Sequence, residues 1–147
     1  MKKTFLLILM AISLFSFTSC EKETVLADNQ TPSEIKTYVQ TYFSDHSILQ
    51  VIKDKDEFEL TYDVMLSDGI TLEFNRKKEI ISIDSNNDLK LPDSVIPEKI
   101  LVYVQSNYPS FYIVGWEVSD RTNQKVELNN DLELIFNKNG DFLRLDD

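Results

Sequence analysis

Carboxylates are the side chains of this sequence with the greatest capacity for chemistry. The 147 residues include 25 Asp and Glu against 15 Lys and Arg, a net charge of −10, but only one His and one Cys. So few nitrogen and sulfur ligands argue against a transition-metal site, and no motif places a Ser-His-Asp or Cys-His set. The acidic balance argues against nucleic-acid binding. We therefore expect no catalytic residues and no cofactor.

Four carboxylates are predicted to form two like-charge pairs on neighbouring strands. A three-residue turn at 67–69, with glycine in the left-handed position, sets the register of a first hairpin and places Asp63 opposite Glu73. The equivalent register in a second hairpin places Glu127 opposite Glu133. Like charges directly opposite one another destabilise a sheet by roughly a few tenths of a kcal/mol. Because the unfavourable pair occurs twice, this surface is suited to meet a basic protein, a peptide, an amine or a divalent metal ion.

Other interpretations of these carboxylates stay open. Exposed acids can be screened by solvent and splay apart, with Lys125 and Arg144 nearby to compensate their charge. Two carboxylates per pair supply fewer oxygens than a hard cation requires, so we assign no metal ligands. Asp68 at the first hairpin tip and Trp116 complete the candidate binding face. Trp116 fits either the core or an exposed interface anchor.

The elements that position the acids occur twice in the chain. Residues 31–40 match 96–105 at an offset of 65, and residues 64–84 match 126–146 at an offset of 62. Matches over this many positions indicate a duplication. We expect an α+β fold of two tandem repeats, each a helix packed on a four-stranded antiparallel sheet. The repeats span residues 31–84 and 96–147, and 85–95 form a linker.

Each repeat is predicted to open with an amphipathic helix. Thr31 is placed to cap the first helix, with Pro32 at its first position and Glu34 completing a capping box. Alternating apolar residues then predict the strands. The predicted strand segments are 48–52, 58–66, 70–74 and 81–83 in the first copy, and the second copy opens with 112–118.

The first 20 residues predict export and a lipid anchor. Two lysines precede an apolar run at 5–17, which is too short to span a bilayer, and small residues precede Cys20. We interpret 1–19 as a signal peptide and 20–30 as a lipidated tether. In the alternative, an ordinary peptidase cuts the signal and Cys20 is incidental. Glu21 after the cysteine favours an outer-membrane address, facing either the periplasm or the cell surface.

The repeat unit resembles a known bacterial family. The pattern of Pro, Ile and Tyr-Val in each helix, followed by Tyr-Asp-Val-Met-Leu-Ser-Asp-Gly-Ile-Thr-Leu-Glu-Phe-Asn at 62–75, is similar to the PepSY-like, beta-lactamase-inhibitor-like family of small exported proteins and lipoproteins. The resemblance implies an extracytoplasmic location and strands that run together into one continuous curved sheet. It carries over no catalytic residues. The second copy departs at Gln124 and Asp131, where the first has Tyr62 and Gly69.

Taken together, these features favour a membrane-tethered extracytoplasmic binding or inhibitory module. Its acidic open sheet face, with the hairpin tips at 67–69 and 129–131, would contact a protein or peptide, which the charge suggests is basic. A cation-binding envelope lipoprotein and a purely structural accessory protein are the alternatives. Neither the identity of a partner nor the oligomeric state follows from the sequence.

Overall fold

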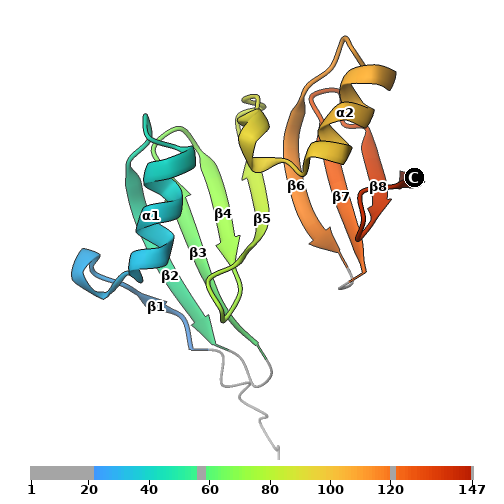
Figure 1. Ribbon diagram of the computed structural model, residues 1–147. Helices are drawn as coiled ribbons and strands as arrows, with labels where there is room; N and C mark the ends of the chain where they lie inside the picture. The colour runs from blue at the N-terminus through green and yellow to red at the C-terminus, as the bar shows by residue number, and fades with distance from the viewer. Residues whose placement is uncertain (1–21, 56–58, 120–121, 147) are drawn as a thin grey trace, which may run out of the picture.

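A nine-stranded antiparallel sheet with two α-helices on one face forms the molecule (Figure 1). The computed structural model describes residues 22–55, 59–119 and 122–146. Neighbours in the sheet are neighbours in the chain, from β1 to β9. The elements are β1 (Thr24–Val25), η1 (Asp28–Gln30), α1 (Ser33–Tyr42), β2 (Ile48–Lys55), β3 (Leu60–Leu66), β4 (Ile70–Phe74), β5 (Ile80–Ser85), η2 (Asp93–Val95), α2 (Glu98–Asn107), β6 (Ile113–Ser119), β7 (Asn123–Leu128), β8 (Glu133–Asn137) and β9 (Phe142–Asp146).

The hairpin registers agree with the sequence prediction. Asp63 lies opposite Glu73 between β3 and β4, and Glu127 lies opposite Glu133 between β7 and β8. Gly69 adopts a φ of 81° at the end of the first turn, and Asp131 adopts a φ of 62° at the matching place in the second. Aspartate is among the few residues besides glycine that populate this region, so both turns direct the chain alike.

One apolar core lies between the helices and the sheet. Phe43, Phe74 and Phe136 are its largest fully buried side chains. The Tyr38 ring of α1 meets Phe74 edge-on at 5.3 Å, and the Tyr103 ring of α2 meets Phe136 in the same way at 5.4 Å. The same aromatic contact therefore joins the apolar face of the helix to the sheet in both repeats. The opposite face of the sheet carries no helix among the described residues, as Figure 1 shows.

Residues 24–30 differ from the tether that the sequence suggests. They form β1 and η1 on the edge of β2, where the amide of Leu26 donates to the Val51 carbonyl at 2.8 Å. Leu26 also packs against the core. The sequence Leu-Ala-Asp at 26–28 matches Leu-Pro-Asp at 91–93, and a 3-10 helix begins at the aspartate of each. An apolar side chain and an unpaired strand edge therefore order a segment that looks polar in sequence.

The predicted capping box of the first helix is wrong. The helix begins at Ser33, with Pro32 as its N-cap and no side-chain cap. The hydroxyl of Thr31 instead donates to the Ala27 carbonyl at 3.3 Å. This bond ties Thr31 back to η1, and no side-chain oxygen of the described residues accepts from the amides of the first helical turn.

The two repeats join through β5 and β6. Their antiparallel register pairs Ser82 with Glu117, Ile83 with Trp116 and Asp84 with Gly115. The segment 85–95, predicted as a linker, contains η2 and returns to the sheet, where the amide of Leu91 donates to the Ile113 carbonyl at 2.9 Å. The junction is therefore an ordinary strand pair, and the open face continues across it.

Candidate functional site

Two parallel rows of side chains cross the open face, each contributed by the strands from β2 to β9. Cross-strand pairing defines them residue by residue. The first row contains Ile52, Asp63, Glu73, Ser82, Glu117, Lys125, Ile135 and Arg144. The second row contains Gln50, Met65, Thr71, Asp84, Gly115, Glu127, Glu133 and Asp146. Acidic side chains thus gather on one continuous surface.

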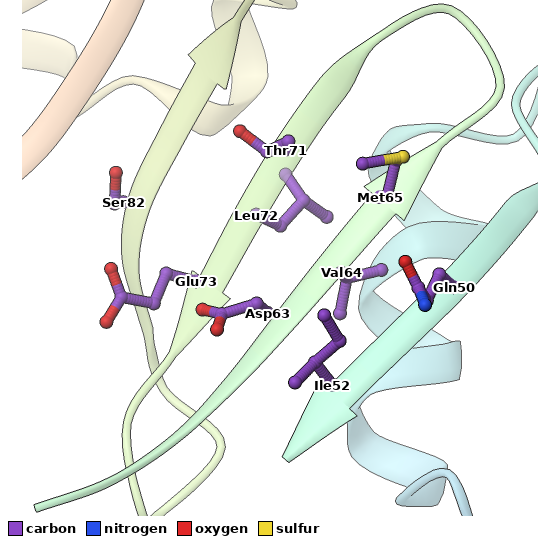
Figure 2. A pocket seen from close by; sticks show the side chains of 9 residues that line it. All are labelled: Gln50, Ile52, Asp63, Val64, Met65, Thr71, Leu72, Glu73 and Ser82. Atoms are coloured by element: carbon purple, nitrogen blue, oxygen red, sulfur yellow. The ribbon is translucent and has the colours of Figure 1, made fainter. Parts of the chain in front are cut away.

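The pair of Asp63 and Glu73 lies in a hollow of the open face. Figure 2 shows the two carboxylates side by side on neighbouring strands, with Ile52 next to Asp63 and Ser82 next to Glu73. The hollow has a volume of about 290 Å³. Its lining residues are Gln50, Ile52, Asp63, Val64, Met65, Thr71, Leu72, Glu73 and Ser82. The hollow therefore presents apolar side chains next to two carboxylates.

The electrostatics of this first pair are uncompensated. Burial, and then the charges of Asp54 and Glu23, raise the pKa of Asp63. Burial, and then the charge of Asp63 followed by other acids, raises the pKa of Glu73. In the described part of the chain, neither carboxylate has a Lys, Arg or His nitrogen within 4.0 Å. Both acids therefore hold their charge at a cost that a cationic ligand would relieve.

The second pair differs because a lysine lies beside it. Lys125 Nζ lies 3.1 Å from Glu133 and 3.3 Å from Glu117, and so bridges two acids. Glu127 forms no ion pair with a basic side chain among the described residues. Burial, and then the charges of Asp84 and Glu133, raise the pKa of Glu127. The compensation expected from Lys125 is present, whereas Arg144 pairs with Asp146 instead. Repeat one therefore carries the stronger unbalanced charge.

A notch at Gly115 lies between two further acids. A Cβ atom at this position would stand 3.4 Å from Glu127 Oε2 and 3.5 Å from Asp84 Oδ2. The notch opens into a hollow of about 120 Å³ that Glu117 and Lys125 also line. Burial, and then the charge of Glu117, raise the pKa of Asp84. Asp84 and Glu117 could not be predicted as site residues from the sequence, because only the β5–β6 register brings them together.

Trp116 does not belong to the open face. Its side chain is only 7% exposed, and its indole Nε1 donates to Gln124 Oε1 at 3.0 Å. Strand alternation turns it towards the helices, where it joins the core. This corrects its place in the candidate binding face and selects the core interpretation. It also explains Gln124, which stands where the first copy has Tyr62 and supplies the acceptor that a buried indole needs.

Asp68 lies at the end of the sheet, apart from the other acids. Its Oδ2 is 3.4 Å from His46 Nε2, and its backbone carbonyl accepts from Asn87 Nδ2 at 2.9 Å. The His46 ring packs edge-on against Phe43 at 5.8 Å. Asp68 therefore belongs to a hairpin-tip cluster, and the sequence prediction had grouped two separate surfaces.

Several predicted features lie beyond what the structure describes. Cys20 and the signal segment 1–19 fall outside the described residues. Within 22–55, 59–119 and 122–146, no helix is long and apolar enough to cross a membrane. The same residues contain no group of three or more His, Cys, Asp or Glu side chains positioned to hold a metal ion.

An antiparallel sheet with two α-helices on one face, built from a duplicated unit, places the described residues among the α+β proteins. The family model described as "Putative beta-lactamase-inhibitor-like, PepSY-like" matches residues 16–61 and again residues 60–144. The chain belongs to this family. The match to two segments agrees with the tandem repeats.

Solved structures of similar fold come from Bacteroides. A "putative periplasmic protein of unknown function" from Bacteroides vulgatus is 34% identical, with a TM-score of 0.79, covering 86% of this chain and 100% of its own. A second putative periplasmic protein from Bacteroides vulgatus is 27% identical, with a TM-score of 0.77 and coverages of 85% and 97%. A "putative calcium-regulated periplasmic protein" from Bacteroides thetaiotaomicron has 24% identity, a TM-score of 0.78 and the same coverages of 85% and 97%.

No curated protein matches the chain. None of the three similar structures is described as an enzyme, and all three are described as periplasmic.

Proposed function

We propose that the chain is a membrane-tethered extracytoplasmic binding or inhibitory module that contacts a basic protein or peptide through its acidic open face. One observation carries the proposal: Asp63 and Glu73 lie opposite each other beside an apolar hollow, with raised pKa values and no neighbouring cation among the described residues. The periplasmic descriptions of similar proteins support the location.

The hollow is suited to a long cationic side chain. Ile52 and Met65 offer apolar surface to the methylene stem of a lysine or arginine, while the two carboxylates meet the charged head. A partner with such a side chain gains charge-assisted hydrogen bonds and relieves the repulsion between the acids. Because the rows continue across β5 and β6, an extended basic segment can follow the same face to Glu117 and Glu127.

Binding of defined peptides tests this function. A short peptide that alternates lysine and leucine should bind, more weakly as salt increases, whereas its glutamate–leucine counterpart should not. The variant Glu73→Lys with Glu133→Lys should lose at least tenfold in affinity by calorimetry. The matched control, Glu34→Lys with Glu98→Lys, changes the charge equally on exposed residues of the helices and should keep binding. Equal losses in both double variants would rule out the open face.

The proposed anchor is tested separately. If Cys20 is acylated, a Cys20→Ala variant should move from the membrane fraction to the soluble fraction of cells. Fractionation of the outer and inner membranes would then check the outer-membrane address. An unchanged membrane fraction would argue against the lipid anchor while leaving the binding face intact.

A divalent cation at the Gly115 notch is a second candidate. Two carboxylate oxygens, one from Asp84 and one from Glu127, border the space left by the missing side chain. Water molecules would have to complete the coordination, as they do at weak calcium sites. The similar Bacteroides thetaiotaomicron protein is described as calcium-regulated, which supports testing this chain for the same ion.

A further inference from the structure

The last strand of the sheet leaves one edge open. β9 pairs with β8 on one side, and no described strand pairs with its other side. Leu143 and Leu145 on this strand are 51% and 41% exposed. An edge strand with unpaired backbone groups and apolar side chains is a template for a further strand. The other end of the sheet differs, because the two-residue β1 already covers β2.

The duplication shows how this edge can be used. At the offset of 62, residues 144–146 of β9 correspond to 82–84 of β5. Those three residues of β5 are the ones that pair with β6 to join the repeats. A bulge precedes the segment in both strands, because the pairing skips Ile81 of β5 and Leu143 of β9. The open edge of β9 thus repeats a surface that already accepts an antiparallel strand within the same molecule.

We propose that this edge binds the same edge of a second copy of the chain, through antiparallel pairing centred on Leu145. In that register Arg144 of each copy lies opposite Asp146 of the other, and Leu145 lies opposite its own equivalent. Opposite charges facing each other across strands are favourable. The neighbouring registers that keep both open faces on one side would set arginine against arginine or aspartate against aspartate. The segment is therefore self-complementary in one register only.

Closure follows from the symmetry of this pairing. A two-fold contact uses the same patch on both subunits and leaves no equivalent edge free, so the product is a dimer rather than a fibre. In the single chain Arg144 contacts Asp146 and donates to the Leu145 carbonyl at 3.3 Å. In the dimer, the ion pair between Arg144 and Asp146 within one chain is replaced by an ion pair between Arg144 of one copy and Asp146 of the other. With only three residues of each strand paired, we expect a weak, concentration-dependent dimer.

A cysteine at the axis tests the register directly. Opposed residues of antiparallel strands have Cα atoms about 4.5–5.5 Å apart, within the range that a disulfide spans. In a Cys20→Ala background, Leu145→Cys should form a disulfide-linked dimer several-fold more than Leu49→Cys when oxidised in air with copper phenanthroline. Leu49 is 62% exposed on β2, so random collision would favour the control. Leu143→Cys, displaced from the axis, should also form less dimer.

Charge exchange gives the second test. Arg144→Asp or Asp146→Arg alone places like charges opposite each other and should reduce the cross-linked fraction several-fold, whereas the double exchange should restore it. Sedimentation of the Cys20→Ala chain with Leu145 intact should show mass increasing with protein concentration. Equal cross-linking at 145 and 49, or failure of the double exchange to restore it, would overturn the proposal. Peptide binding by the open face is measured separately by calorimetry, so failure of the dimer proposal leaves the proposed function intact.

Discussion

Glu73 illustrates what a single residue contributes to this surface. It lies opposite Asp63 on one side and Ser82 on the other, so a neighbouring strand supplies repulsion without a compensating cation among the described residues. Because the pKa of Glu73 is raised in the folded protein, the folded chain holds more protons than the unfolded chain between the ordinary pKa of the carboxyl and the raised one. Such a residue favours function over stability, because its charge is retained at a cost.

Replacing this glutamate by its neutral isostere should therefore stabilise the fold. Glu73→Gln is expected to increase the free energy of unfolding at pH 7 by roughly 0.2–1 kcal/mol, the range for cross-strand pairs. The gain should shrink as the pH falls through the raised pKa towards 4.5, because the glutamate then takes up a proton in the native protein too. Urea unfolding between pH 4 and 8 measures this difference. A gain of the same size from Glu98→Gln, on the exposed side of α2, would contradict the explanation.

Elements differ in how far their sequence determines them. Alternating apolar residues at 60–66 and 70–74 were sufficient to predict two strands and their register, because a one-residue slip would bury Asp63 and Glu73. β1 could not be predicted, since two residues have no periodicity and their strand depends on the edge of β2. The family resemblance implied one continuous sheet, but no sequence pattern gave the register between β5 and β6, so Asp84 and Glu117 entered the site only through tertiary pairing.

Leu26 is expected to hold this unpredicted element in place. Leu26→Ala removes apolar contact with the core and should lower the free energy of unfolding by roughly 1–2 kcal/mol, less than a fully buried leucine would cost. The amide of residue 26, which donates to Val51, should also exchange its hydrogen faster. Val25→Ala, at the exposed β1 residue that directly precedes Leu26, serves as the control. Similar losses from both variants would show that Leu26 has no special role.

For the molecule as a whole, the open face combines acids from both repeats. The two rows begin on β2 and end on β9, so a ligand can contact both copies at once. Trp116 shows the limit of sequence reasoning at this scale. Its residue type suited an interface, whereas its alternation along β6 places it in the core. Which face a residue occupies depended on a bulge between Ile113 and Gly115 that composition does not reveal.

Calcium-dependent melting tests whether the whole fold is linked to a cation. If the notch binds calcium with a dissociation constant of about 1 mM, then 10 mM calcium should stabilise the native protein by roughly 1.4 kcal/mol. Sodium chloride at equal ionic strength should have less effect, and Asp84→Asn with Glu127→Gln should abolish the calcium-specific increase in melting temperature. An unchanged melting temperature up to 10 mM calcium would eliminate the second candidate function.

The strand order has a further consequence for how the molecule is made. Each strand pairs only with the strand immediately before it and the strand immediately after it in the chain. The sheet can therefore assemble without waiting for a strand from a distant part of the sequence. Short loops join the partners of each hairpin, and of the described strand pairs only β1–β2 and β5–β6 have a helix between them, so the entropy of closure stays low for most of the sheet and favours rapid folding. A chain that emerges with its N-terminus first can therefore add strands in order from β1 to β9. The β9 edge is completed last, after the rest of the sheet has formed.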